Sequence, residues 1–138
     1  MSTHLKEKEE KILRVFERIA EESTRGTPII VEGKKDIEAL RIMAVEGKII
    51  SAKTGGRNLL DVISEVEKIG AGEVILLLDF DRRGREWTKS LKQQLEKARI
   101  KPNITFWREL LELVSREVKD VEGLATYMKT LKRKICNS

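Results

Sequence analysis

Short runs of apolar residues alternate along this chain with longer stretches in which apolar residues recur every three or four positions. The two clearest runs, 28–31 and 73–78, consist largely of β-branched and aliphatic residues. Continuous apolar runs of this length are typical of strands that are covered on both faces, as in a parallel sheet. Weaker runs at 49–52 and 100–102 predict a second strand and a short edge strand, because Pro102 cannot donate a ladder hydrogen bond.

The longer stretches predict amphipathic helices, with charged residues between their apolar positions. One helix is expected over 3–22 and another from Asp36 to Gly47, with Asp36 as its cap. Four further helices are expected from the same spacing. Their apolar residues are Leu59, Val62, Ile63 and Val66 in the first, Trp87, Leu91 and Leu95 in the second, Phe106, Leu110, Leu113 and Val114 in the third, and Val121, Leu124, Ala125, Met128 and Leu131 in the fourth. Asp120 is expected to cap the fourth helix. Because Trp87, Phe106 and Trp107 fall on apolar positions, we expect them in the core.

Strands that alternate with helices predict an α/β fold. We therefore expect one domain over residues 1–138, with three layers in a Rossmann-like arrangement. Its sheet should contain about four, mainly parallel, strands flanked by helices. The segment 1–26 is expected to add an N-terminal helix, and the segment 103–138 a C-terminal helical extension.

Acidic residues follow two of the predicted strands directly. Glu32 comes after the first strand, and Asp79 and Asp81 come after the third. Because ligands of such sheets bind beyond the carboxyl ends of the strands, we expect all three carboxylates at one edge. Residues two apart in an extended chain point to the same face, so Asp79 and Asp81 are expected to reach one ion.

Oxygen ligands of this kind predict a hard cation, Mg²⁺ in the first place, with Mn²⁺ as a substitute. Glu32 could complete the shell of that ion, or it could act as a general acid or base. The alternative is that Asp79 and Asp81 only cap a turn and the helix that follows.

Basic residues and glycines surround these carboxylates in the sequence. The candidate phosphate contacts are Lys34, Lys35, Gly55, Gly56, Arg57, Arg82, Arg83 and Arg85. Backbone N–H groups of the glycine loop could cradle a phosphate at the start of a helix, or the loop could be an ordinary turn. The cations could equally serve to balance the acidic cluster.

Composition narrows the classes of function. The net charge of +5 and the isoelectric point near 9.4 permit a polyanionic partner. With 37% charged residues and only 2 prolines, the chain resembles proteins of thermophiles. Cys136 is the only cysteine, which excludes a disulfide within the chain and fits a cytoplasmic location. Because no apolar run reaches 18 residues, no membrane span is expected.

The two acidic motifs together resemble the Toprim domain, over about residues 27–102. The matching residues are Val31-Glu32-Gly33, Asp36, and Asp79-Phe80-Asp81-Arg82-Arg83-Gly84, the last in the form found in small stand-alone Toprim proteins of archaea and bacteria. This domain is shared by type IA and type II topoisomerases, bacterial-type primases, overcoming-lysogenization-defect nucleases and a ribonuclease that matures 5S ribosomal RNA. The resemblance implies that Asp79 and Asp81 bind Mg²⁺ and that Glu32 is the general acid or base, with Asp36 as a possible supporting acid.

The rest of the chain limits which Toprim activity to expect. The only tyrosine is Tyr127, in the C-terminal segment, and no DNA-gate domain accompanies it. One cysteine and one histidine cannot form the zinc motif of a primase, and no Walker A sequence is present. These absences leave a free-standing Toprim domain wrapped by extra helices.

Three functions remain open. The first is a Mg²⁺-dependent nuclease, with a slight preference for RNA over DNA because the ribosomal-RNA-processing type is the nearest named relative. The second is a non-catalytic accessory subunit of a replication, repair or RNA-processing complex, which grips nucleic acid through the metal. The third is a partial nucleotidyl transferase that needs a partner protein. Nucleic acid is the expected partner in each case, and the sequence leaves the oligomeric state open.

Overall fold

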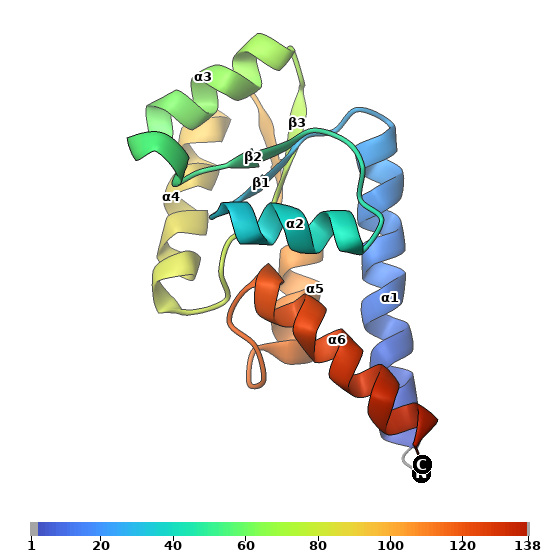
Figure 1. Cartoon of the computed structure of the whole chain (residues 1–138). Helices are drawn as coiled ribbons and strands as arrows, with labels where there is room; N and C mark the ends of the chain where they lie inside the picture. The colour runs from blue at the N-terminus through green and yellow to red at the C-terminus, as the bar shows by residue number, and fades with distance from the viewer. Residues whose placement is uncertain (1–2, 138) are drawn as a thin grey trace.

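A computed structural model describes residues 3–137 and places a four-stranded sheet between two layers of helices (Figure 1). The strands are β1 (Ile29–Val31), β2 (Ile49–Ser51), β3 (Glu73–Leu76) and β4 (Lys101–Asn103). They are hydrogen-bonded in the order β2-β1-β3-β4, and every described pairing is parallel. β4 lies at the edge, where Pro102 is tolerated as predicted.

Within residues 3–137, six α-helices and one short 3₁₀ turn connect and cover these strands. They are α1 (Thr3–Thr24), α2 (Lys34–Ile42), η1 (Thr54–Gly56), α3 (Leu59–Ile69), α4 (Arg82–Lys97), α5 (Thr105–Val114) and α6 (Val121–Cys136). The three-layer α/β fold with a parallel sheet and additional terminal helices is therefore confirmed. Across residues 3–137, none of the helices has the length and apolar character that crossing a membrane requires.

Alternate residues of the strands face the two helical layers. Ile30 of β1 and Leu76 of β3 form one cluster with residues of α3 and α4, and this cluster includes Leu91 and Leu95 of α4. Ile29, the neighbour of Ile30, lies in the other cluster, with α1, α2, α5 and α6. Both faces of the sheet are covered, which explains why its strands are continuous apolar runs rather than alternating ones.

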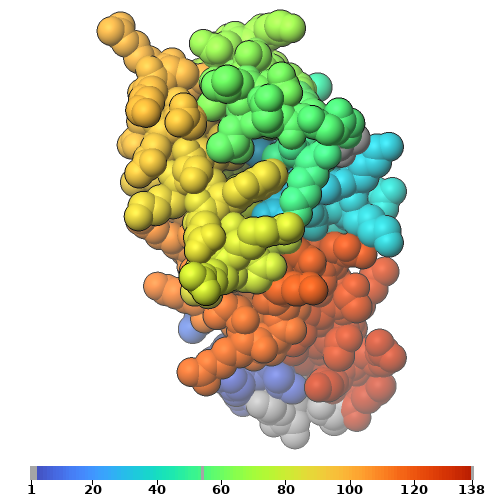
Figure 2. All heavy atoms as spheres, turned by 90° about the vertical axis from the view of Figure 1, so that its left-hand side faces the viewer, coloured from blue at the N-terminus to red at the C-terminus, as the bar shows by residue number. Residues whose placement is uncertain are grey.

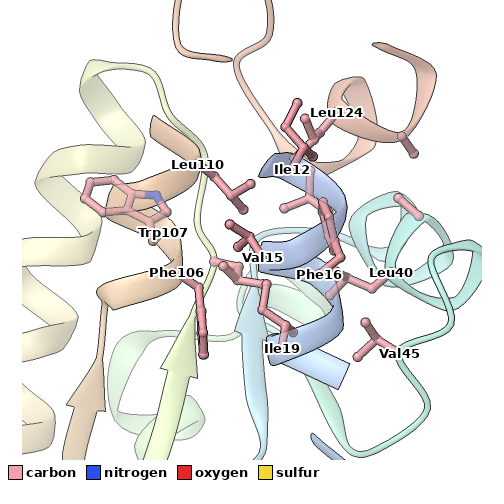
Figure 3. Close-up of a cluster of buried hydrophobic side chains, with 14 of the residues drawn as sticks. Ile12, Val15, Phe16, Ile19, Leu40, Val45, Phe106, Trp107, Leu110 and Leu124 are labelled. Carbon is pink, nitrogen blue, oxygen red and sulfur yellow. The ribbon is translucent and has the colours of Figure 1, made fainter. Parts of the chain in front are cut away.

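The larger of the two clusters joins the terminal helices to the sheet (Figure 3). Ile12, Val15, Phe16 and Ile19 of α1 point into it, as the helical spacing predicted. Phe106 and Trp107 of α5 are buried, which confirms their assignment to the core, and Trp87 of α4 is half-buried against the other cluster. The indole Nε1 of Trp107 donates to the carbonyl of Leu78 at 2.9 Å and so ties α5 to the end of β3.

The helix α2 ends earlier than its apolar spacing predicted. It stops at Ile42, and Ala44 has a φ of 68°, in the left-handed region. This break lets the fully buried Val45 turn into the core. The guanidinium of Arg41 then donates to the carbonyls of Val45 (3.1 Å) and Gly47 (2.8 Å), which replaces the helical hydrogen bonds that are lost.

Asp36 does not cap α2 in the predicted way. The N-cap is Gly33, and Asp36 lies at the third helical position, where its Oδ2 accepts a hydrogen bond from the backbone N–H of Gly33 at 3.1 Å. Asp120 does cap α6 as predicted, since its Oδ1 accepts from the N–H of Gly123 at 2.6 Å. The other boundaries differ from the predicted ones by a few residues at most.

Gly84, in the first turn of α4, allows this helix to lie directly on the end of β3. A Cβ at Gly84 would lie 2.1 Å from the carbonyl oxygen of Asp79 and 2.8 Å from its Cβ. These distances are far shorter than any van der Waals contact, so the backbone itself would have to move. The glycine thus fixes the position of Asp79 relative to α4 through contact rather than through a special backbone angle.

We predict that Gly84→Ala lowers the free energy of unfolding by about 1–3 kcal/mol, the usual cost of overpacking a close contact. Gly72→Ala is the matched control, because a Cβ at that position meets nothing within 4 Å. The control should change stability by less than about 0.5 kcal/mol. Urea denaturation of both variants measures the difference, and equal stability of the two would contradict the close approach at Gly84.

Candidate metal centre

A cleft of about 280 Å³ lies at the carboxyl ends of β1 and β3. Its lining consists of Glu32, Gly33, Lys34, Lys35, Asp36, Lys53, Asp79, Asp120 and Glu122. In Figure 2, the orange-red start of α6 borders on the cyan α2 and on the yellow-green start of α4. The cleft therefore combines the predicted strand-end position with a wall that comes from the C-terminal extension.

Glu32, the residue after β1, is held on every side. Only 3% of it is exposed. Its backbone carbonyl accepts from the N–H of Lys53 at 3.0 Å and from the hydroxyl of Ser51 at 3.2 Å. Its Oε1 accepts from the N–H of Asp79 at 3.4 Å, and its Oε2 lies 2.9 Å from Nζ of Lys53 and 3.5 Å from Nη2 of Arg83. The position of this carboxylate is therefore rigid.

Asp79 forms a carboxyl pair with Glu32. Burial raises the pKa of Asp79, and its hydrogen bond to the Glu32 carboxyl and the negative charges of Glu32, Asp36 and Asp120 raise it further, to about 8. With a pKa of about 8, the Asp79 carboxyl is largely protonated at neutral pH, which relieves its repulsion with Glu32. A cation that replaced this proton would allow both groups to ionise.

Asp81 is not brought together with the other two acids. Its Oδ1 accepts from the N–H of Gly84 at 2.8 Å and caps α4, and the residue lies outside the lining of the cleft. The chain bends at Phe80 and Asp81 before α4 begins, and the buried Phe80 donates its N–H to the carbonyl of Lys119 at 2.6 Å. The rule that residues two apart share a face does not hold across this turn, and capping, the alternative for Asp81, is what the structure contains.

Among residues 3–137, no group of three or more His, Cys, Asp or Glu side chains is arranged to hold a metal ion. The donor set nonetheless fits Mg²⁺. This ion is usually held by one or two carboxylates and by phosphate oxygens of the substrate, and it keeps several waters. Glu32 and Asp79 supply two such carboxylates in the lining of the cleft, and their proximity contributes to the raised pKa of Asp79.

Three of the residues that line the cleft were not predicted as site residues from the sequence. Asp120 and Glu122 come from the start of α6, and Lys53 follows β2. Asp36 joins α6 to the cleft, because its Oδ1 accepts from the N–H of Glu122 at 3.0 Å. Burial raises the pKa of Asp36, whereas its hydrogen bonds from the backbone of Glu122 and Gly33 act in the opposite direction.

The predicted phosphate contacts fall into two groups. Lys34 and Lys35 line the cleft, and Arg83 reaches its edge at Glu32. Arg82 and Arg85 are exposed on the first turn of α4, with Arg82 paired to Glu86 at 3.2 Å. Two of these five cations line the cleft and Arg83 contacts Glu32, whereas Arg82 and Arg85 lie outside the lining.

The glycine loop does not contribute to the cleft. Gly55 and Gly56 have φ values of 75° and 68° in η1 and lie outside the lining of the cleft. The guanidinium of Arg57 is held by the carboxylate of Glu65 on α3, and it also donates to the carbonyl of Ser51 at 3.3 Å. The geometry therefore matches the ordinary turn, which was the alternative for this loop.

Comparison with known proteins agrees with this architecture. The Toprim domain family matches residues 27–108, which include Glu32, Asp79 and the whole sheet. The chain is 38% identical to the UPF0292 protein of Methanocaldococcus jannaschii over 120 residues, covering 86% of this chain and 91% of that protein. It is 34% identical to a UPF0292 protein of Methanosarcina acetivorans, covering 91% and 85%.

A solved structure from Aquifex aeolicus has the same fold, with a TM-score of 0.66 and 26% identity. The similarity covers 79% of this chain and 94% of that one. The relatives are thus small archaeal proteins of similar length, together with a bacterial structure. The match over 27–108 is longer at its C-terminal side than the predicted 27–102 and reaches into α5. The chain belongs to the Toprim domain family.

Proposed function

We propose that this protein is a Mg²⁺-dependent nuclease that cleaves phosphodiester bonds, with RNA preferred over DNA. One observation carries the proposal: the buried Glu32 and the half-buried Asp79 meet at the carboxyl edge of the sheet, where Oε1 of Glu32 accepts from the N–H of Asp79 and both residues line the cleft. Toprim domains generally bind Mg²⁺, and a nucleic-acid-related function follows from the family. The preference for RNA rests on the resemblance of the two acidic motifs to the ribosomal-RNA-processing type.

The side chains of the cleft have separate roles in this proposal. Asp79 and Glu32 would hold the ion, which supplies charge neutralisation on the phosphoryl oxygens when it is bound. Glu32 carries the proton to or from the attacking water or the leaving hydroxyl, because it is rigidly held and opens on the cleft. Lys34 and Lys35 orient the phosphate from the first turn of α2.

The charge of the cleft explains why a cation is required. Its lining holds five carboxyl groups but only three lysines. A phosphodiester that entered such a site without a metal would meet net negative charge. Binding of the substrate in the cleft should therefore depend on the divalent ion, whereas the arginines of α4 act outside it.

A second candidate is the accessory subunit that grips nucleic acid without cleaving it. It is favoured by the observation that, within residues 3–137, no three acids form a ready-made ion shell. Incubation of labelled single-stranded RNA and DNA with the protein, with and without Mg²⁺ or Mn²⁺, separates the two functions. Metal-dependent shortening of the RNA supports the nuclease, and a metal-sensitive gel shift without shortening supports the subunit.

Glu32→Gln should separate binding from chemistry. Glutamine retains the size and the hydrogen bonding of Glu32 but cannot carry the proton. At a Mg²⁺ concentration that saturates the variant, we expect cleavage to fall by about two to four orders of magnitude, the usual contribution of a general acid or base, with near-normal affinity for the oligonucleotide. Single-turnover cleavage and a gel shift measure the two quantities, and cleavage at the wild-type rate would exclude Glu32 as the proton carrier.

Asp79→Asn should alter the pH dependence of stability in the metal-free protein. The pKa of Asp79, about 8, lies above its ordinary value of 3.8. Such a group contributes stability that is fully present below its ordinary pKa and is lost as the pH rises through about 8. Wild-type protein in EDTA should therefore melt at progressively lower temperature from about pH 4 to pH 9, and Asp79→Asn should lose this dependence.

Thermal melts with and without Mg²⁺ complete this test. The ion should restore the stability of the wild type at high pH, because it replaces the lost proton, and should have little effect on Asp79→Asn. Glu67→Gln, on an exposed position of α3, is the control for loss of one carboxylate. Parallel pH curves for wild type and Asp79→Asn would refute the raised pKa of Asp79.

The arginines of α4 are expected to contribute salt-dependent affinity. Replacing Arg82 and Arg83 by alanine should reduce the slope of log affinity against log salt by about one to two, since each lost phosphate contact removes about 0.7–0.9. Lys89→Ala with Lys97→Ala removes the same charge from exposed positions further along α4. Fluorescence anisotropy over a range of salt concentrations compares the pairs, and equal slopes would place the substrate path elsewhere.

A further inference from the structure

Lys53 is the basic residue that contacts the carboxyl pair most closely. It follows β2, the strand next to β1, and its backbone N–H donates to the carbonyl of Glu32 at 3.0 Å. Its Nζ lies 2.9 Å from Oε2 of Glu32 and 5.7 Å from the ring centroid of Trp87. The sequence analysis assigned Lys53 no role, because the parallel pairing of β1 with β2 is what brings it to Glu32.

Lys53 and Glu32 differ in their exposure to solvent, and this difference indicates which of the two can move. The Glu32 side chain is 3% exposed, whereas that of Lys53 is 39% exposed. A buried carboxylate requires a cation, and Lys53 supplies it from the cleft side. When another cation takes its place at Glu32, the lysine can leave, because its flexible stem is partly exposed to solvent. Trp87 offers the ammonium a second favourable contact nearby.

Lys53 and a divalent ion would compete for Glu32. An ion bound between Glu32 and Asp79 carries two positive charges and repels the ammonium group. The phosphate that the ion attracts carries negative charge into the same cleft, which Lys53 also lines. Lys53 would therefore lose Glu32 as its partner at the point where the phosphate comes within its reach.

We propose that Lys53 is the counter-ion of Glu32 before the metal binds and a ligand of the substrate phosphate afterwards. This inference rests on the proposed function of the cleft. In the first state Lys53 keeps the buried carboxylate paired. In the second state it adds its positive charge to that of Lys34 and Lys35, which line the same cleft from the start of α2.

The test compares Lys53→Gln with Lys34→Gln. Both variants remove one positive charge from the cleft, but within residues 3–137 Lys53 forms an ion pair with Glu32 and Lys34 does not. Titration calorimetry with Mn²⁺ is performed at about pH 8.5, so that protons compete little. Lys53→Gln should bind Mn²⁺ about three- to tenfold more tightly than wild type, and Lys34→Gln less than about twofold. Lys53→Arg, which keeps the charge, should stay near wild type.

The same proteins are then titrated with a labelled single-stranded oligoribonucleotide in Mn²⁺, and its length is checked on a gel after each measurement. Lys53→Gln should bind it more weakly, with the salt slope reduced by about 0.7, the value for one phosphate contact on a single strand. Lys53→Arg should retain most of the affinity, which distinguishes loss of charge from a damaged fold.

The outcomes separate this inference from the proposed function. If wild type binds Mn²⁺ and the oligonucleotide, but Lys53→Gln matches Lys34→Gln in its Mn²⁺ affinity, the counter-ion role is overturned and the function stands. Tighter Mn²⁺ binding with unchanged oligonucleotide affinity would overturn the phosphate role. A wild type that binds neither Mn²⁺ nor the oligonucleotide overturns the proposed function and this inference together.

Discussion

The parallel pairing of β1 with β3 brings two carboxyl groups together, one buried and one half-buried. Ile30 is paired with Leu76, and beyond this pair Glu32 follows β1 directly while Asp79 comes three residues after β3, with its N–H donating to Oε1 of Glu32. Burial and the neighbouring Glu32 carboxyl raise the pKa of Asp79. This raised pKa, the contact with Lys53 and the fit to a divalent cation are all responses to this one constraint.

The C-terminal extension is part of the site rather than an appendage. Its loop is tied to the end of β3 by the hydrogen bond from Phe80 to Lys119, and α6 is tied to α2 by the bond from Glu122 to Asp36. The cluster of apolar side chains from α1, α5 and α6 then holds this arrangement on the sheet. Damage to the extension should therefore reach the cleft directly.

Sequence reasoning predicted the features that depend on one local rule. Apolar runs identified the strands, helical spacing identified the core of α1 and α5, and the strand-end rule placed Glu32 beside Asp79. It failed where the outcome depended on a turn or on distant packing. Asp81 caps α4 because the chain bends at Phe80, and the early end of α2 follows from the burial of Val45.

Lys53 and the acids of α6 could not be found from the sequence for a related reason. Lys53 reaches Glu32 only because β2 is adjacent to β1, and strand order is not encoded in any single run of residues. Asp120 was correctly predicted as the cap of α6, but a cap position does not reveal that the start of α6 lies beside the cleft. Such residues become visible as site residues only when the packing of the elements is known.

The acids around the cleft divide into two kinds, and this division identifies the ion site. Asp81 and Asp120 cap α4 and α6, and Asp36 accepts from the backbone at the starts of α2 and α6. N–H donors and the positive ends of the helix dipoles favour the ionised form of these groups, whereas burial of Asp36 acts in the opposite direction and raises its pKa. Glu32 and Asp79 are not helix caps within the described residues; Glu32 is paired with Lys53 and Arg83, and the pKa of Asp79 is raised to about 8. Five neighbouring acids can therefore fold together without a metal, while leaving one pair whose charge only a cation can balance.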